Sequence, residues 1–307
     1  MNRRETASKS PDARPLRLKR CILCGNGRFV ATMRTRLPWV QQCTRCGLAL
    51  ANPQPSRAEL AAIYDEDYYR TFGHDAVGAA GYHRMKEVRF SRLLEVAERH
   101  FPVGRLLDVG SALGELLVVG RRRGWRPQGV EPNGYAVGVA NQALPGATFH
   151  GTIEDYVVRH SGFDLVTCLD VLEHVRRPDQ HLRRIHDLLW PGGGLLVTTI
   201  DVSSFPACLL GHRWWHYHRD HLWYFSRTSL VALARDAGLE VVTCCRARKI
   251  FDMHYILEIL ARTPNSGLLR RASRAALAVL PRRVLTQIFS LPEGLLLIAR
   301  RPVRSSP

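Results

Sequence analysis

The sequence predicts an α/β protein in which a small N-terminal zinc ribbon precedes a mostly parallel, doubly wound sheet. The sheet is predicted because apolar runs of strand length alternate with helical segments from residue 105 onward. The ribbon is predicted because two Cys-x-x-Cys pairs, each followed by glycine, stand ahead of this region. A glycine-rich turn after the first strand of the sheet adds a candidate ligand site.

Composition places the chain among ordinary globular proteins. It has 307 residues, of which 46% are hydrophobic and 23% charged, so it is long enough for two domains and is not generally disordered. The 44 Lys and Arg exceed the 27 Asp and Glu by 17. This balance would suit nucleic acid, an anionic membrane surface or a phosphorylated substrate. The arginines are scattered as pairs rather than gathered in one block, which favours a solvated basic surface.

The N-terminal segment lacks a secretion signal. Residues 1–19 are rich in Ser, Pro, Arg and Lys, without an apolar core, and we expect them to form a disordered basic tail. No apolar run reaches the roughly 18 residues of a transmembrane helix. We therefore expect a cytoplasmic protein whose eight cysteines stay reduced.

The paired cysteines predict a structural zinc site. Cys21 and Cys24 form the first pair, Cys43 and Cys46 the second, and 18 residues separate the pairs. Four thiolates at this spacing close a tetrahedral zinc site with no open position, so we assign the zinc ribbon to residues 20–52. A module of this size has little core, and metal binding then supplies much of its folding free energy.

Residues 53–101 are expected to form a helical linker or lid region. Ser56 would cap a short helix over residues 57–64, and a longer helix is expected at about 82–101. An aromatic cluster lies between the two helices, namely Tyr64, Tyr68, Tyr69 and Phe72. It could cover the mouth of a ligand site or pack the ribbon onto the main domain, and the sequence leaves both alternatives open.

The main domain is expected over residues 102–307. Strands are expected at 105–109, 127–130, 147–150, 163–169, 194–199, 239–245 and 294–299. Helices are expected at 115–123, 135–142, 179–189 and 229–237, with a basic helical insert at about 250–291. Such an insert could touch a membrane or a carrier protein, but is more often a lid or a homodimer face. The alternation of strands and helices stops for 28 residues, from 200 to 227. This segment is rich in Trp and His and indicates a functional loop.

The first strand of the main domain leads into a nucleotide-sized cradle. Asp108 is the last residue but one of the strand, and Gly110, Ser111 and Gly114 let the backbone approach a ligand before a helix begins. Glu131 ends the next strand, where a carboxylate can accept hydrogen bonds from ribose hydroxyls. The spacing Gly-x-x-x-Gly does not match the Gly-x-Gly-x-x-Gly turn of dinucleotide-dependent oxidoreductases.

Four motifs in order make the chain resemble the class I S-adenosylmethionine-dependent methyltransferases. The motifs lie at residues 108–114, 129–131, 163–166 and 188–193, and the resemblance covers about 105–246. It implies a Rossmann-like, seven-stranded sheet with its last strand antiparallel, and S-adenosylmethionine as cofactor. The layout of ribbon, methyltransferase domain and aromatic loop is similar to bacterial methyltransferases of secondary-metabolite, deoxysugar and glycan gene clusters. Ser111 and Ala112 stand where Cys and Gly are frequent, and all four residue types are small.

The resemblance also implies which residues contact the cofactor. They are Asp108, Gly110, Ser111, Gly114, Glu131, Ile153, Glu154, Leu169 and Asp170. The glycine turn would meet the methionine part with Asp108 nearby, and Glu131 would bind both ribose hydroxyls. Ile153 and Glu154 would border the adenine. Leu169 and Asp170, at the end of a strand, would face the sulfonium.

A second segment resembles a metal site. Residues 170–174, Asp-Val-Leu-Glu-His, are similar to the Glu-x-x-Glu-His segment of quinone O-methyltransferases and of a small-RNA methyltransferase. There, a divalent metal lies beside the acceptor oxygen, so Asp170, Glu173, His174 and the loop residue His221 would hold Mg²⁺, Mn²⁺ or Zn²⁺ here. Asp170 replaces the usual Glu and reaches less far. Two alternatives remain open: His174 or His221 acts as a catalytic general base, or the acidic residues complement a helix N-terminus and His174 is a local hydrogen-bond partner.

We therefore expect a methyltransferase that acts on an oxygen of a small molecule, such as a natural product, a sugar or a glycan precursor. An RNA methyltransferase that uses the ribbon and the basic surface is the alternative within the same enzyme class. A cofactor- or nucleic-acid-binding protein without catalysis is the third hypothesis. The acceptor depends on the loop from 200 to 227, where His221 lies.

Overall fold

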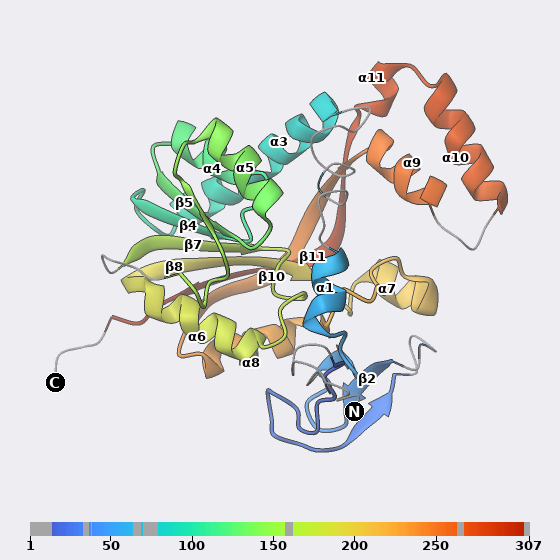
Figure 1. Ribbon diagram of the computed structural model, residues 1–307. Coiled ribbons are helices and arrows are strands. Elements are labelled where there is room, and N and C mark those ends of the chain that lie inside the picture. Colours follow the sequence, from blue (N-terminus) through green and yellow to red (C-terminus); the bar gives the residue numbers. More distant parts are fainter. Residues whose placement is uncertain are drawn as a thin grey trace, which may run out of the picture.

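A seven-stranded sheet forms the centre of the protein in the computed structural model, which describes residues 14–32, 37, 39–63, 69, 79–156, 162–262 and 267–303 (Figure 1). In spatial order the strands are β10 (Glu240–Asp252), β11 (Ile288–Arg300), β8 (Leu189–Ile200), β7 (Phe163–Leu169), β4 (Arg105–Val109), β5 (Arg126–Glu131) and β6 (Thr148–His150). Strands β4 to β8 run parallel, and β11 is antiparallel to both of its neighbours. This arrangement confirms the predicted fold class and the antiparallel last strand.

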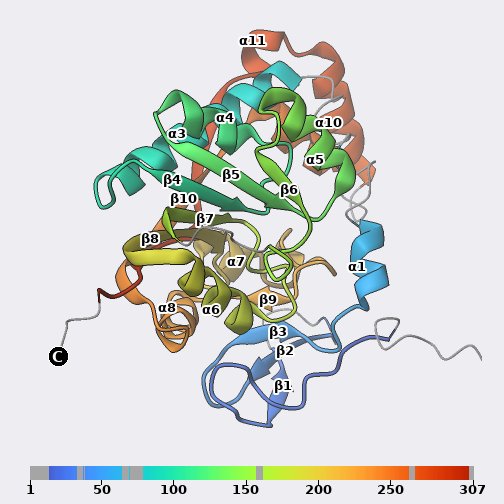
Figure 2. The same ribbon diagram turned by 60° about the vertical axis from the view of Figure 1, so that its left-hand side comes forward.

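Helices cover both faces of the sheet. One face is covered by α3 (Ala79–Glu98), α4 (Glu115–Arg122) and α5 (Gly134–Ala143), the other by α6 (Pro178–Leu188) and α8 (Arg227–Asp236) (Figures 1 and 2). Successive residues of a strand point to opposite faces. Leu106 therefore packs into the core beneath α3 and α4, whereas Leu107 joins the core beneath α6 and α8. This double burial explains the continuous apolar runs of the central strands.

The ribbon builds a second, four-stranded sheet with the help of the main domain. Its strands are β1 (Phe29–Ala31), β2 (Val40–Cys43), β3 (Ala49–Ala51) and β9 (Trp223–Tyr224), in that order. Strand β9 belongs to the long loop of the main domain, and Leu50 pairs with Trp223 across the junction. Both cysteine pairs border the buried cluster beneath α6 and α8. The ribbon and the main domain thus share one hydrophobic core.

The segment between β8 and α8 is ordered, contrary to the expectation of an irregular loop. It contains α7 (Phe205–Leu210), a 3₁₀ turn (Gly211–Arg213) and β9. Ser204 caps α7, since its hydroxyl accepts a hydrogen bond of 3.3 Å from the Ala207 N–H. A two-residue strand has no detectable periodicity, and its partner β3 lies far away in the sequence. Local patterns therefore could not predict this structure.

The linker follows its predicted capping. Helix α1 (Arg57–Ile63) begins after Ser56, whose hydroxyl accepts from the Glu59 N–H at 3.1 Å. In return, the Glu59 carboxylate accepts from the Ser56 N–H at 2.7 Å. These two bonds form a capping box. Three members of the predicted aromatic cluster and residues 1–13 of the predicted tail lie outside the described residues.

Strands β10 and β11 form a hairpin that is longer than the sequence suggested. Strand β11 pairs with β8 only from Gly294 to Arg300, but it pairs with β10 as far as Asp252 opposite Ile288. The hairpin therefore projects beyond the carboxyl end of β8. At its tip it carries α9 (Met253–Arg262), α10 (Gly267–Val279) and α11 (Arg282–Leu285) (Figure 1).

Among the described residues, no helix combines the length and the apolar character that a membrane span requires. The cytoplasmic location stays a prediction.

Replacement of Trp223 by Ala should destabilise the fold. Trp223 is 1% exposed, and its indole N–H donates to the Val175 carbonyl at 2.8 Å. Loss of a buried Trp costs about 3–5 kcal/mol, because a cavity and an unpaired carbonyl remain. Urea unfolding followed by circular dichroism would measure this loss. Trp215→Ala is the matched control, since Trp215 lies in the same loop but is 38% exposed. Equal losses in the two variants would contradict the role assigned to β9.

Candidate functional site

The turn after β4 is a tight left-handed loop. Gly110, Ala112 and Gly114 have φ angles of 75°, 47° and 82°. A Cβ atom at Gly110 would lie 2.4 Å from Cγ2 of Val171, and one at Gly114 would lie 2.8 Å from Cβ of Ala140. Glycine is therefore required at both positions for the backbone to approach its neighbours. The contact with Val171 also places the end of β7 beside this loop.

Glu131 holds the glycine loop through its carboxylate. The side chain is buried, and it accepts backbone N–H bonds of 3.0 Å from both Ala112 and Asn133. The hydrogen bond to Glu131 helps Ala112, which unlike glycine has a Cβ atom, to keep its positive φ angle. The hydroxyl of Tyr69 donates to the same carboxylate at 3.2 Å. Tyr69 therefore lies beside the predicted ribose site, which favours the first alternative for this residue, namely a position at the mouth of a ligand site.

Two further polar groups are buried at the base of the loop. Asp108 accepts a hydrogen bond of 2.6 Å from the Thr167 hydroxyl. Burial raises the pKa of Asp108 to about 7 and also raises the pKa of Glu131. The hydroxyl of Ser111 is buried and has no hydrogen-bond partner among the described residues. A buried polar atom without a partner is costly, so this hydroxyl suits a ligand contact.

The two residues predicted at the adenine face different surroundings. Ile153 is buried within the main core. The carboxylate of Glu154 lies 3.5 Å from Nδ1 of the buried His181 on α6. This contact lowers the pKa of Glu154 to about 2. The adenine contacts themselves stay predictions.

Asp170 turns toward the helix α3, away from the other predicted metal ligands. It has a positive φ of 55°. Its carboxylate pairs with Arg89 at 2.5 Å and accepts from the Thr198 hydroxyl at 3.2 Å. Leu169, the last residue of β7, is half-buried beside it. Arg89 carried no motif in the sequence, so neither partner of Asp170 could be predicted.

Glu173, His174 and His221 form a compact cluster on the other side of β8. One potential ligand atom from each residue lies within 4.8 Å of the others, and Asp170 is not part of this group among the described residues. Glu173 is buried and accepts from the Thr199 hydroxyl at 2.8 Å. The cluster therefore brings together three of the four residues predicted for the second metal site.

Backbone carbonyls fix the two imidazole rings. Nδ1 of His174 lies 3.0 Å from the Asp220 carbonyl, and Nδ1 of His221 lies 2.7 Å from the His216 carbonyl. A carbonyl only accepts, so each Nδ1 carries a proton when it donates there, and each neutral ring keeps a lone pair on Nε2. The two rings meet edge to face with centroids 4.7 Å apart.

Burial keeps His221 neutral. Desolvation lowers the pKa of His221 well below its ordinary value of 6.5, and the neighbouring histidines 174, 216 and 218 add to this effect. A neutral imidazole is the form that binds metal ions. A ring whose pKa is lowered in this way is a weaker general base.

The explanation of this segment as a helix N-terminus is wrong. Helix α6 begins only at Pro178, and residues 171–174 form a turn. The Glu173 carbonyl instead accepts the N–H groups of Leu222 and Trp223 at 2.7 and 3.2 Å. The turn is thus joined to the loop that carries His221.

The four ribbon cysteines converge as predicted. Their sulfur atoms all lie within 4.8 Å of one another, with Cys21 to Cys46 and Cys24 to Cys43 both at 3.5 Å. The glycine after each pair has a positive φ, 70° at Gly25 and 73° at Gly47. The thiols differ in acidity: burial raises the pKa of Cys21 and of Cys46, whereas at Cys43 donation from backbone N–H groups and from Asn26 outweighs burial and lowers the pKa to about 6. Four converging thiols of this kind suit a tetrahedral metal ion.

Comparisons with known proteins agree with this geometry. A model of the methyltransferase domain family matches residues 82–244, more than half of the chain. The chain is 29% identical over 150 residues to the ubiquinone biosynthesis O-methyltransferase of Aromatoleum aromaticum, covering 44% of this chain and 64% of the relative. It is 33% identical over 164 residues to the enzyme of the same name from Ruegeria pomeroyi, covering 47% and 63%. The chain thus spans less than two thirds of either relative.

A solved structure supports the fold alone. A crystal structure of a protein from Bacillus halodurans is 16% identical with a TM-score of 0.50, and the match covers 70% of this chain and 99% of that one.

Asp108→Asn should flatten the dependence of stability on pH. The folded-state pKa near 7 lies above the ordinary 3.8, so between these values only the folded protein binds the proton. The free energy of unfolding therefore falls as pH rises through this window, by up to about 4 kcal/mol for this residue. Urea unfolding at a series of pH values would show a smaller fall in the variant. Asp236→Asn, at an exposed site on α8, should keep the original profile. Unchanged pH dependence in Asp108→Asn would contradict the assignment.

Proposed function

The chain belongs to the methyltransferase domain family, and we propose from this premise that it transfers the methyl group of S-adenosylmethionine to a hydroxyl oxygen of a small molecule. The observation that supports this best is the proximity of two groups of residues at the carboxyl edge of the sheet. The glycine loop contacts Val171, and the Glu173, His174 and His221 cluster begins two residues later. Ligands bind at this edge in open α/β sheets.

The glycine loop and Glu131 would hold the cofactor. S-adenosylmethionine supplies a methyl group that is already activated on a sulfonium. The residues of this chain therefore have to bind, align and exclude water. Glu131 would accept from both ribose hydroxyls, and Tyr69 would cover that part of the site. The buried hydroxyl of Ser111 and the backbone of Gly110 fit the methionine part, with Asp108 beneath them.

The acidic and histidine cluster would activate the acceptor. We infer that Glu173, His174 and His221 hold a divalent metal ion, because their ligand atoms converge and both rings present Nε2. A bound divalent ion would lower the pKa of the acceptor hydroxyl. The low pKa of His221 makes a general-base role for this residue the weaker alternative. The relatives named ubiquinone biosynthesis O-methyltransferase support an oxygen acceptor on a small molecule.

The four cysteines would hold a structural zinc ion. The site is formed by thiols alone, which leaves no position for a substrate. The zinc ion would act by stabilising the ribbon, because strand β3 of the ribbon pairs with β9 next to His221. The net charge of +17 supports the alternative of an RNA acceptor, whereas the relatives reported above carry the name ubiquinone biosynthesis O-methyltransferase, which supports a small acceptor.

Glu131→Ala should weaken cofactor binding at least tenfold. A carboxylate that accepts two ribose hydroxyls contributes more than about 1.4 kcal/mol, which corresponds to a factor of ten. Titration calorimetry with S-adenosylhomocysteine would measure the loss. Glu240→Ala is the control, since Glu240 is exposed at the start of β10. Wild-type affinity in Glu131→Ala would exclude this residue from the cofactor site.

His221→Ala should lose methyl transfer but bind S-adenosylhomocysteine normally. Turnover would be measured with a panel of hydroxylated aromatic and sugar acceptors, and metal content by mass spectrometry. The variant should contain one metal equivalent less than the wild type, and Glu173→Gln should show the same deficit. His212→Ala, at an exposed site in the same loop, serves as the control. Retained metal together with full turnover in His221→Ala would refute the proposed acceptor site.

A further inference from the structure

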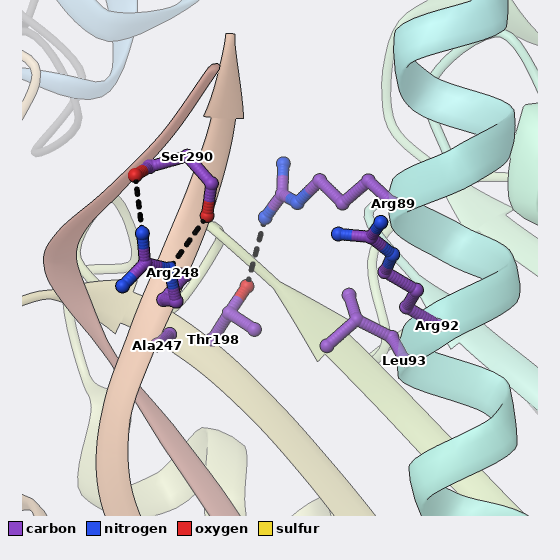
Figure 3. Close-up of a pocket in the computed structure, with 7 residues that line it drawn as sticks. All are labelled: Arg89, Arg92, Leu93, Thr198, Ala247, Arg248 and Ser290. Carbon is purple, nitrogen blue, oxygen red and sulfur yellow. Dashed lines mark hydrogen bonds between the residues drawn. The ribbon is translucent and has the colours of Figure 1, made fainter. Parts of the chain in front are cut away.

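A cavity of about 390 Å³ opens between α3, the end of β8 and the β10–β11 hairpin (Figure 3). Its lining residues are Arg89, Arg92, Leu93, Thr198, Ala247, Arg248 and Ser290. Three of them are arginines, and none is acidic. We call this cavity the arginine pocket. It has the size of small-molecule sites in proteins, which begin at roughly 300 Å³.

The three arginines line the pocket from two elements, α3 and the hairpin. Arg89 and Arg92 lie one turn apart on α3, and Figure 3 shows both reaching toward the hairpin that carries Arg248. Arg248 donates from Nε to the Ser290 hydroxyl and from its terminal nitrogen to the Ser290 carbonyl, both at 2.8 Å. Both acceptors are neutral, so these two hydrogen bonds do not neutralise the positive charge of Arg248.

One carboxylate is tied to the pocket. Asp170 pairs with Arg89 at its edge, whereas Arg92 and Arg248 have no carboxylate partner among the described residues. Arg92 and Arg248 are exposed, so water screens part of the repulsion among the three cations, and the single carboxylate of Asp170 offsets part of the remainder. The N–H donors of a guanidinium group match the geometry of phosphate and carboxylate oxygens. The charge and the concavity together point to an anion.

The position of the pocket favours an anion on the methyl acceptor rather than on the cofactor. The glycine loop and Glu131 lie at the ends of β4 and β5, whereas the pocket lies over β8, β11 and β10, on the opposite side of β7. Arg248 and Ser290 belong to the part of the hairpin that projects past β8. The pocket is therefore displaced from the ribose site, and Asp170 links it to the end of β7.

We propose that the arginine pocket binds an anionic group, phosphate or carboxylate, of the methyl acceptor. This inference rests on the proposed function, because it assumes that the acceptor lies at the carboxyl edge. Arg92 and Arg248 contact the anion, and Asp170 orients Arg89 from behind. The acceptor is thus a small molecule that carries a phosphate or a carboxylate in addition to the methylated hydroxyl.

Calorimetric titration of the full-length protein tests this assignment. Inorganic phosphate, pyrophosphate and benzoate are titrated at low ionic strength into protein saturated with S-adenosylhomocysteine. At least one of them should bind, and the combined Arg92→Gln and Arg248→Gln variant should bind it at least tenfold more weakly. Arg92→Gln alone should show a smaller loss, and it keeps the hydrogen bonds of Arg248 to Ser290. Arg235→Gln, at an exposed site on α8, should stay within twofold of the wild type.

The outcomes separate this inference from the proposed function. Failure to bind S-adenosylhomocysteine would count against the proposed function itself. Normal binding of S-adenosylhomocysteine with no binding of any anion would overturn the arginine pocket alone. Anions that bind only in the absence of S-adenosylhomocysteine would assign the pocket to the cofactor's own carboxylate and overturn the acceptor assignment. Anion binding that the double variant retains in full would also overturn it.

Discussion

The two-residue strand β9 is the junction on which the ribbon, the acceptor loop and the end of β7 depend. Leu222 and Trp223 donate to the Glu173 carbonyl, and the Trp223 indole donates to Val175. On the other side, the Ala51 N–H donates to the Leu222 carbonyl at 2.9 Å. These bonds are buried, so each lost partner would cost the desolvation of the other. The ribbon therefore supports the position of His221 and Glu173 without contributing a side chain to their cluster.

The end of β8 divides the carboxyl edge into two chemical environments. Thr198 and Thr199 are consecutive, so their hydroxyls point to opposite faces of the sheet. Thr198 bonds to Asp170 and Arg89 beside the arginine pocket, whereas Thr199 bonds to Glu173 beside the two histidines. Cationic groups that would hold an anion thus stand on one side, and groups that would bind a metal stand on the other. The two environments are separated by β8, so an acceptor that used both would have to reach around the carboxyl end of this strand.

The fold and the cofactor loop could be predicted because their signals are local. The strand before Asp108 is apolar and buried on both faces, and the glycines at 110 and 114 are required by left-handed backbone and by close contacts. The cysteine spacing likewise encodes a local turn at each pair. Burial of Asp108 and the Tyr69 contact with Glu131 depended on packing, so the raised pKa of Asp108 could not be derived, and an aromatic contact at the predicted ligand site was only one of two alternatives.

The sequence by itself determined the class of the sheet, the convergence of four cysteines, the glycine loop and the pairing of Glu173 with His174. The residues that decide these features lie close together in the sequence, and even the two cysteine pairs are only 18 residues apart. Only the tertiary structure decided that Asp170 turns to Arg89 rather than to Glu173 and the two histidines, and that Arg92 and Arg248 line one cavity. It also decided that the ribbon completes its sheet with Trp223 and Tyr224. These contacts join segments that are distant in the sequence, and only the packing of α3, the hairpin and the ribbon against one sheet brings them together.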